Sequence, residues 1–183
     1  EHLLIRESKY LGQGEAIAAW QRLGATFGSD ANAETTPTHT VYKLDIPDIS
    51  DAKLAESFKL LSGMVRAPVL NDVNVGAERP IVLAEKRERG GAGQRMADLT
   101  RQTFFAGQRL ATRNPIGTDE TLKAANGKGV KAFYDRWYRP ENTTIVVAGD
   151  ADPMVLAGLV EQWFGDWKGS GKPGATPAFG DPV

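Results

Sequence analysis

The sequence predicts an α+β domain, in which helices pack on an antiparallel or mixed sheet. Residues 38–46 alternate polar and apolar side chains, with Tyr42, Leu44 and Ile46 on one face, as expected of a half-buried strand. Residues 143–149 form a run rich in β-branched side chains, which is typical of a buried central strand. Helical patterns occupy most of the remaining chain, and this combination of strands and helices defines the class.

The elements before the alternating strand follow from cap and turn residues. Residues 15–23 are rich in helix formers, and Gly24 stands where a C-terminal cap belongs. A second strand is predicted at 26–35, joined to the alternating strand by a turn at Thr36-Pro37. Its side chains are small and polar, so we expect it at the edge of the sheet.

The middle and C-terminal part of the chain is predicted to be mainly helical. We expect helices at 52–64, at 77–89 with a break at 90–93 and a continuation to 105, at 130–138, and from Pro153 to 163, with loops at 68–76 and 114–118 and a short helix opened by Asp119-Glu120. The Gly- and Pro-rich end is typical of a linker. The predicted organisation is therefore a domain at 1–167 and a linker or tail at 168–183.

Composition excludes several classes of function. The 183 residues carry 22 basic and 23 acidic side chains, which disfavours a nucleic-acid partner. With 0 cysteines, neither disulfides nor thiolate zinc sites can form. No apolar run approaches the roughly 20 residues of a membrane span. None of this determines the compartment.

Two acids and one Glu-His pair are the candidates for chemistry. Glu78 and Glu85 are seven residues apart on a predicted helix, which places both carboxylates on nearly the same face, two turns apart. Glu1 and His2 precede another helical stretch. A hydrolytic zinc site needs nitrogen and carboxylate ligands and a free carboxylate as base. The alternative, a solvated helix face beside Arg79 and a solvated terminus, remains open on spacing alone.

Several ordered stretches resemble the insulinase-like zinc metallopeptidases, the family of pitrilysin, insulin-degrading enzyme and mitochondrial processing peptidase. That family carries an inverted motif, His-x-x-Glu-His, of which Glu1-His2 would be the last two residues. The similar stretches, which span most of positions 1–167, are residues 23–28 running into 32–35, then 114–118, 133–142 and 145–150. No single stretch is decisive, but the ordered set is specific. The resemblance implies the half-domain fold of these peptidases, in its N-terminal type.

The resemblance also implies roles for individual residues. His2 would ligate Zn²⁺, Glu1 would be the general base for the zinc-bound water, Glu85 the distal zinc ligand, and Glu78 a supporting acid in the outer shell. An extended peptide substrate would add as a strand to the edge formed by Asn32, Ala33 and Glu34.

Two departures from the family pattern qualify these roles. The chain has no initiator Met and begins in mid-helix, so we expect a fragment truncated inside the motif, with the first His three residues before Glu1. His2 and Glu85 are also further apart than the family pattern suggests, and an insertion in the predicted loop 68–76 would absorb the difference.

The sequence thus predicts a fragment of a zinc-dependent metalloendopeptidase, inactive as this chain alone. The alternative is a non-catalytic homologue that serves as a structural or peptide-binding half of a two-part peptidase. Expected partners are a peptide or protein substrate and a second homologous domain or subunit. Overall resemblance points to the bacterial periplasm, while substrate and oligomeric state remain undetermined.

Overall fold

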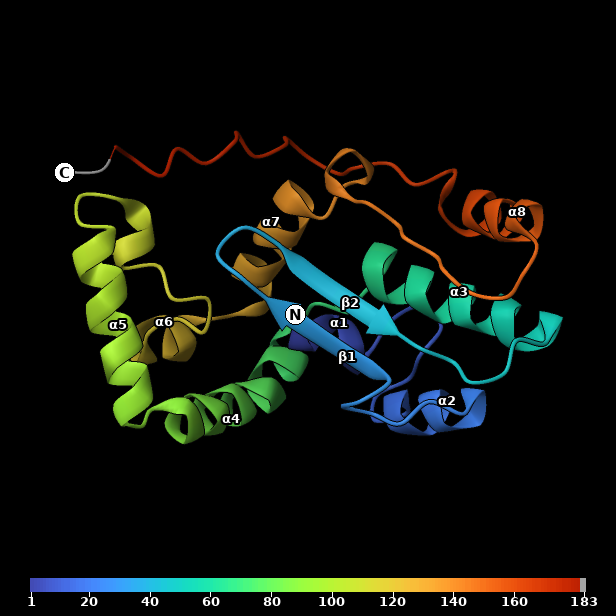
Figure 1. Ribbon diagram of the computed structural model, residues 1–183, viewed down its shortest axis with the longest axis horizontal. Helices are drawn as coiled ribbons and strands as arrows, with labels where there is room; N and C mark the ends of the chain where they lie inside the picture. Colours follow the sequence, from blue (N-terminus) through green and yellow to red (C-terminus); the bar gives the residue numbers. More distant parts are fainter. Residues whose placement is uncertain (182–183) are drawn as a thin grey trace.

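The computed structural model describes residues 1–181 and confirms the α+β class (Figure 1). Over these residues the elements are α1 (His2–Arg6), α2 (Ala16–Leu23), β1 (Ala31–Thr35), β2 (Thr40–Leu44), α3 (Asp51–Arg66), α4 (Asp72–Arg89), α5 (Ala92–Phe104), the 3₁₀ helix η1 (Arg109–Ala111), α6 (Asp119–Ala124), α7 (Gly127–Trp137), η2 (Pro140–Asn142) and α8 (Pro153–Phe164). None of the described helices has the length and apolar character needed to cross a membrane.

The sheet, within residues 1–181, is one antiparallel pair of strands. β1 and β2 pair in the register Ala31↔Leu44 to Thr35↔Thr40. β1 is shorter than the predicted 26–35 because its first half is a turn. There, the carboxylate of Asp30 accepts a hydrogen bond from the Thr26 N–H at 2.8 Å, and Gly28 has φ +99°, a left-handed conformation that interrupts a strand.

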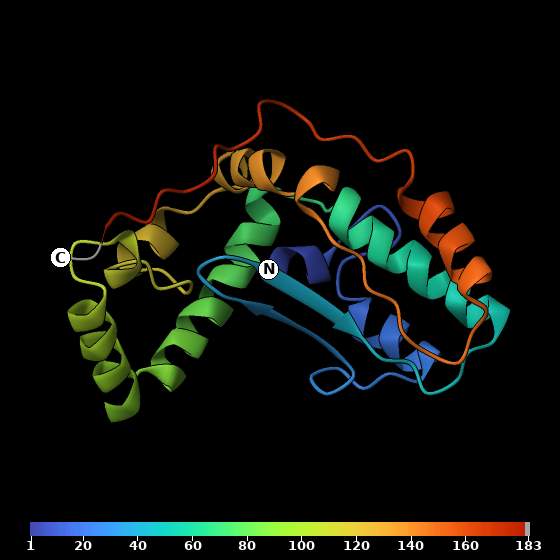
Figure 2. The same cartoon turned by 45° about the horizontal axis from the view of Figure 1, so that its top comes forward.

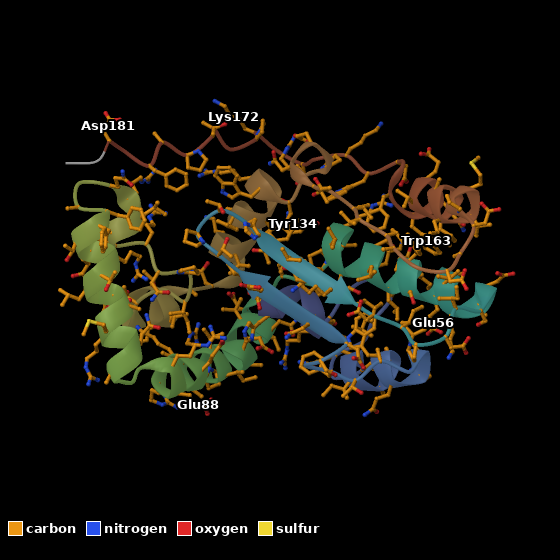
Figure 3. The ribbon with its side chains drawn as sticks, in the orientation of Figure 1. Glu56, Glu88, Tyr134, Trp163, Lys172 and Asp181 are labelled. Carbon is orange, nitrogen blue, oxygen red and sulfur yellow. The ribbon has the colours of Figure 1, made fainter. Side chains whose placement is uncertain are left out.

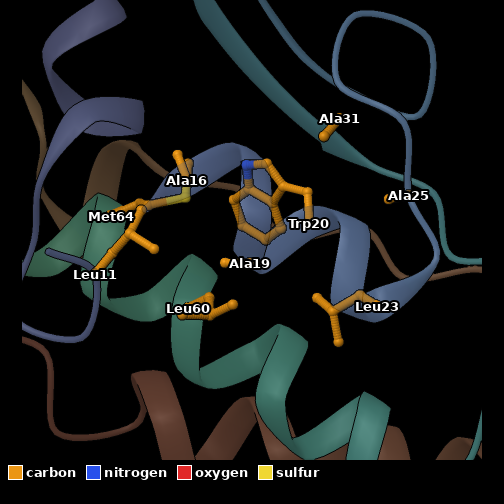
Figure 4. Packing of buried hydrophobic residues seen from close by; sticks show 9 residues of the cluster. All are labelled: Leu11, Ala16, Ala19, Trp20, Leu23, Ala25, Ala31, Leu60 and Met64. Carbon is orange, nitrogen blue, oxygen red and sulfur yellow. The ribbon is translucent and has the colours of Figure 1, made fainter. Parts of the chain in front are cut away.

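The apolar core lies between α2, α3 and the start of β1 (Figure 4). Trp20 and Leu23 on α2 are the largest apolar side chains that are almost completely buried. Leu60 and Met64 face them from α3, and Ala31 closes the cluster from β1. α2 ends at Gly24 with φ +87°, whose N–H bonds back into the last turn, as the glycine predicted.

The predicted loop at 68–76 is wrong over its second half. α4 begins at Asp72 because the side chain of Asn71 caps it, accepting a hydrogen bond from the Asn74 N–H at 2.8 Å. The helix continues through Pro80, which leaves the Gly76 carbonyl without its usual N–H partner. Gly76 is exposed, so water can satisfy that carbonyl. Residues 72–76 of the segment expected to hold an insertion are therefore the start of α4.

The predicted central strand at 143–149 is also wrong. Thr143 has an extended backbone, with φ −117° and ψ 134°, but the segment pairs with no strand among residues 1–181. All seven residues are exposed, and Val146 is 85% exposed. A β-branched run favours extended backbone, but a strand forms only where a neighbouring strand accepts its hydrogen bonds. Figures 1 and 2 draw this segment as coil between α7 and α8.

The C-terminal tail passes over α7 toward η1 (Figure 2). It is bonded along its path: the Gly174 N–H donates to the Arg136 carbonyl, and the Arg109 N–H donates to the Phe179 carbonyl at 2.7 Å. Ser170 also donates its hydroxyl proton to Asp135. The boundary between domain and linker at 167/168 remains a prediction, and residues 182–183 lie outside the described part.

Truncation of Trp20 tests the core. Trp20→Ala should lower the free energy of unfolding by about 3–5 kcal/mol, because it removes a buried indole and leaves a cavity between α2 and α3. Urea denaturation followed by circular dichroism measures the change. Ile17→Ala, on the same helix but 52% exposed in the wild type, is the control and should stay within about 0.5 kcal/mol. Equal effects of the two substitutions would contradict this core.

Candidate metal centre

α1 and α4 pack together and bring three of the candidate residues into one place. His2 opens α1, while Glu78 and Glu85 lie two turns apart on α4. The His2 Nδ1 atom lies 3.3 Å from Glu78 Oε2, and its Nε2 atom lies 3.3 Å from Glu85 Oε2. The two carboxylates thus face the two ring nitrogens of one imidazole.

The pair of His2 Nε2 and Glu85 Oε2 fits zinc. Two ligands bonded to Zn²⁺ at about 2.0–2.1 Å with a tetrahedral angle are about 3.3–3.4 Å apart, which matches the 3.3 Å between these atoms. Glu78 faces the other nitrogen, where an outer carboxylate normally holds a ligating histidine. Among residues 1–181, no group of three or more His, Asp or Glu side chains is arranged to hold a metal ion, so the described residues show no complete zinc site.

Glu78 and Glu85 each also pair with an arginine. Arg6 Nη1 lies 2.6 Å from Glu78 Oε1, and Arg89 Nη2 lies 2.6 Å from Glu85 Oε1. The Glu78 side chain is 13% exposed and that of Glu85 is 28% exposed, whereas Arg89 is largely in solvent at 68%. Glu78 is therefore held by a shielded pair, while Glu85 remains the more accessible carboxylate.

Glu1 lies at the end of the strand pair. The Thr35 hydroxyl donates a hydrogen bond to the Glu1 carboxylate, and it lies 3.2 Å from the Thr40 hydroxyl on β2. Figure 1 shows the N-terminus beside these two strands. The candidate base therefore lies next to the candidate substrate edge.

The predicted substrate edge is an edge in the structure, since β2 is the only strand that pairs with β1 among the described residues, apart from an isolated bridge between Ala31 and Phe27. Asn32 and Glu34 are exposed and Ala33 is half-buried. The Ala33 N–H donates to the Asn32 side-chain oxygen at 2.9 Å, so it lies on the side away from β2. A strand added here would have to replace that local bond.

Sequence reasoning missed Arg6 and Asn74. Arg6 follows His2 by four residues on α1, and Asn74 precedes Glu78 by four on α4, so helical periodicity places each beside a candidate. The signal for Arg6 was available in the sequence. The signal for Asn74 was hidden, because that position was expected in a loop.

A tyrosine cluster holds the strand pair against α7. The hydroxyls of Tyr42 on β2 and Tyr138 lie 2.9 Å apart, and the Tyr138 ring stacks on that of Tyr134 at 5.1 Å. Burial, and then the neighbouring Tyr138, raise the pKa of Tyr42, while burial raises the pKa of Tyr134 to about 12. Tyr42 and Tyr134 therefore stay protonated. The Tyr134 hydroxyl, at the position labelled in Figure 3, donates to the Val65 carbonyl at 2.6 Å.

Comparison with known proteins agrees with a peptidase half-domain. Residues 125–183 match the family model described as "Peptidase M16 inactive domain". The chain is 31% identical to the probable zinc protease PqqL of Haemophilus influenzae over 162 residues, which is 88% of this chain and 18% of that protein. The chain thus spans less than a fifth of the length of this relative.

Solved structures show the same fold. The first half of the periplasmic protease PqqL from Escherichia coli superposes with a TM-score of 0.89 at 26% identity, covering 96% of this chain and 38% of that one. A mutant of the ferredoxin protease FusC in complex with Arabidopsis ferredoxin gives 0.87 at 26% identity, covering 100% of this chain and 20% of that one. The chain belongs to the insulinase-like M16 peptidase family.

Removal of one phenol tests the anchor of the strand pair. Tyr138→Phe should lower the free energy of unfolding by about 1 kcal/mol, because the partly buried Tyr42 hydroxyl loses its partner. The double variant Tyr42→Phe/Tyr138→Phe removes both partners and should be less destabilised than the two single effects added together. Urea denaturation measures this cycle. Strict additivity would show that the two hydroxyls do not interact.

Proposed function

We propose that this chain contributes to a zinc-dependent endopeptidase that hydrolyses peptide bonds by metal-activated water. The observation that carries the proposal is the 3.3 Å separation of His2 Nε2 and Glu85 Oε2, which matches two ligands of one tetrahedral zinc. Glu78 supports His2 from the other nitrogen, at 3.3 Å. The relative named a probable zinc protease supports the same chemistry.

Four residues of the chain would have separate roles in this reaction. His2 and Glu85 would hold Zn²⁺, which supplies Lewis acidity and lowers the pKa of a bound water. Glu1 would accept the proton of that water and later pass it to the leaving amine. Thr35, by donating to Glu1, would keep the carboxylate at the end of β1.

The substrate we propose is an extended peptide or protein segment that adds to the free edge of β1. Asn32, Ala33 and Glu34 would line it, with backbone hydrogen bonds providing affinity. The structural relative in complex with ferredoxin supports a protein substrate for its own enzyme. We further propose a second homologous half as the partner, and the bacterial periplasm as the compartment, since a structural relative is described as the first half of a periplasmic protease.

A second candidate is a non-catalytic half that binds peptide or stabilises its partner domain. One observation favours it: the family model that matches residues 125–183 is described as an inactive domain. That match does not include His2, Glu78 or Glu85, so it leaves their roles open.

Sequencing of the coding region upstream of Glu1 separates the two candidates. A histidine codon three positions before Glu1 supports the enzyme, because it completes the donor set of two His and one Glu. Any other residue there would sink the zinc assignment and leave the non-catalytic half.

For the chain as it stands, we expect weak zinc binding and no peptidase activity, since two protein donors retain little of the affinity of three. Elemental analysis after gel filtration should give far less than one zinc per chain, and a quenched fluorescent peptide should remain intact. His2→Ala should abolish the residual binding, whereas His39→Ala, in the β1–β2 turn, should not. Stoichiometric zinc in the purified wild type would overturn this expectation.

A further inference from the structure

We propose that Arg6 and Asn74 are positioning residues that orient Glu78 and, through it, the ring of His2. The inference rests on the proposed zinc site and adds to it the elements that set which nitrogen of His2 faces the metal. It is carried by a hydrogen-bonded chain that runs from a buried amide to the imidazole.

Asn74 anchors this series of hydrogen bonds. Its side chain is completely buried, at 0% exposure, and both ends of the amide are used. The nitrogen donates to the Glu7 carboxylate at 2.7 Å and to the Val69 carbonyl at 3.0 Å. The oxygen accepts from Arg6 Nε at 3.3 Å. If the amide were flipped, its nitrogen would face the Arg6 donor and its oxygen would face the Glu7 and Val69 acceptors. The orientation of the Asn74 amide is therefore determined.

Arg6 transfers that orientation to Glu78. Its guanidinium is held at two points, with Nε on Asn74 and Nη1 on Glu78 Oε1 at 2.6 Å. A planar guanidinium bound at two points cannot turn without breaking one of the bonds. Because Glu78 is 13% exposed, solvent screens this pair only weakly.

The orientation of Glu78 determines which ring nitrogen of His2 faces Glu85. With Oε1 of Glu78 bonded to Arg6, the other oxygen, Oε2, lies at His2 Nδ1. The Nδ1 atom is then engaged, and Nε2 is the nitrogen that faces Glu85. A histidine whose second nitrogen is held by a carboxylate presents a defined donor atom, and loss of such support typically costs about 10–100-fold in metal affinity.

The sequence offers a site-resolved test, because His2 and His39 are its only two histidines. Zinc chloride is titrated into the ¹⁵N-labelled chain while the imidazole nitrogens are followed by long-range ¹H–¹⁵N NMR. In the wild type, zinc should shift Nε2 of His2, while Nδ1 keeps its proton and His39 stays unchanged. In Arg6→Gln, the affinity should fall about 10-fold, and both nitrogens of His2 should respond.

Two further variants separate positioning from simple stability. Arg6→Lys keeps a positive charge beside Glu78, but its side chain cannot also hydrogen-bond to Asn74. The zinc affinity of this variant should therefore lie between those of the wild type and Arg6→Gln. Arg22→Gln breaks an exposed pair with Glu56 and should leave the titration unchanged. Circular dichroism verifies that each variant is folded, and Arg6→Lys carries the test if Arg6→Gln does not fold.

The outcomes distinguish the two proposals. If zinc leaves His2 of the wild type unshifted, the proposed zinc site fails. If zinc binds Nε2 of the wild type and binds the folded Arg6 variants with the same affinity at the same nitrogen, the positioning role fails while the zinc site stands. Zinc binding at Nε2 in the wild type, together with weaker binding and a response at both nitrogens of His2 in Arg6→Gln, supports both proposals.

Discussion

The Glu78 carboxylate, shared between Arg6 and His2, is the interaction on which the arrangement of the candidate site depends. It joins α1 to α4 across more than seventy positions of sequence, and it does so with one oxygen for each partner. A carboxylate at 13% exposure is costly to bury unless it is paired and hydrogen-bonded. The pair with Arg6 offsets that cost, and the second oxygen is then available for the imidazole. The bond between Arg6 and Glu78 thus offsets the cost of burying the Glu78 carboxylate and also orients its second oxygen toward His2.

The rest of the chain supports this contact from two directions. On one side, the apolar cluster around Trp20 packs α2 against α3 and holds the start of β1 at Ala31. On the other, the hydroxyl contact between Tyr42 and Tyr138 holds β2 against the end of α7. Together they place the end of β1 where Thr35 reaches Glu1. The edge and the base are therefore positioned by packing that lies outside the site.

The sequence predicted those elements whose signals are local. The C-terminal glycine of α2 and the Asp152-Pro153 start of α8 act within one turn of the helix that they bound, so both elements were found. Glu78 and Glu85 were recognised as neighbours because a helix repeats every 3.6 residues. Their convergence on His2 could not follow from spacing, since it depends on how α1 packs on α4. It was expected only through resemblance to a family.

The errors share one physical origin. Residues 143–149 have strong β propensity, but propensity supplies no hydrogen-bond partner, and the segment stays unpaired with any strand and exposed among the described residues. The segment 68–76, which contains Asn71, Asp72 and Asn74, was predicted to be a loop, and Asn and Asp are indeed common in turns. In the structure Asn71 caps a helix, and Asn74 is buried by contacts with Glu7 and Arg6, far away in the sequence. The same polar side chain serves a turn or a buried network, and only tertiary contacts decide between them. A residue buried for such contacts is therefore the one that single-sequence reasoning overlooks, and here it is the residue that holds the site in place.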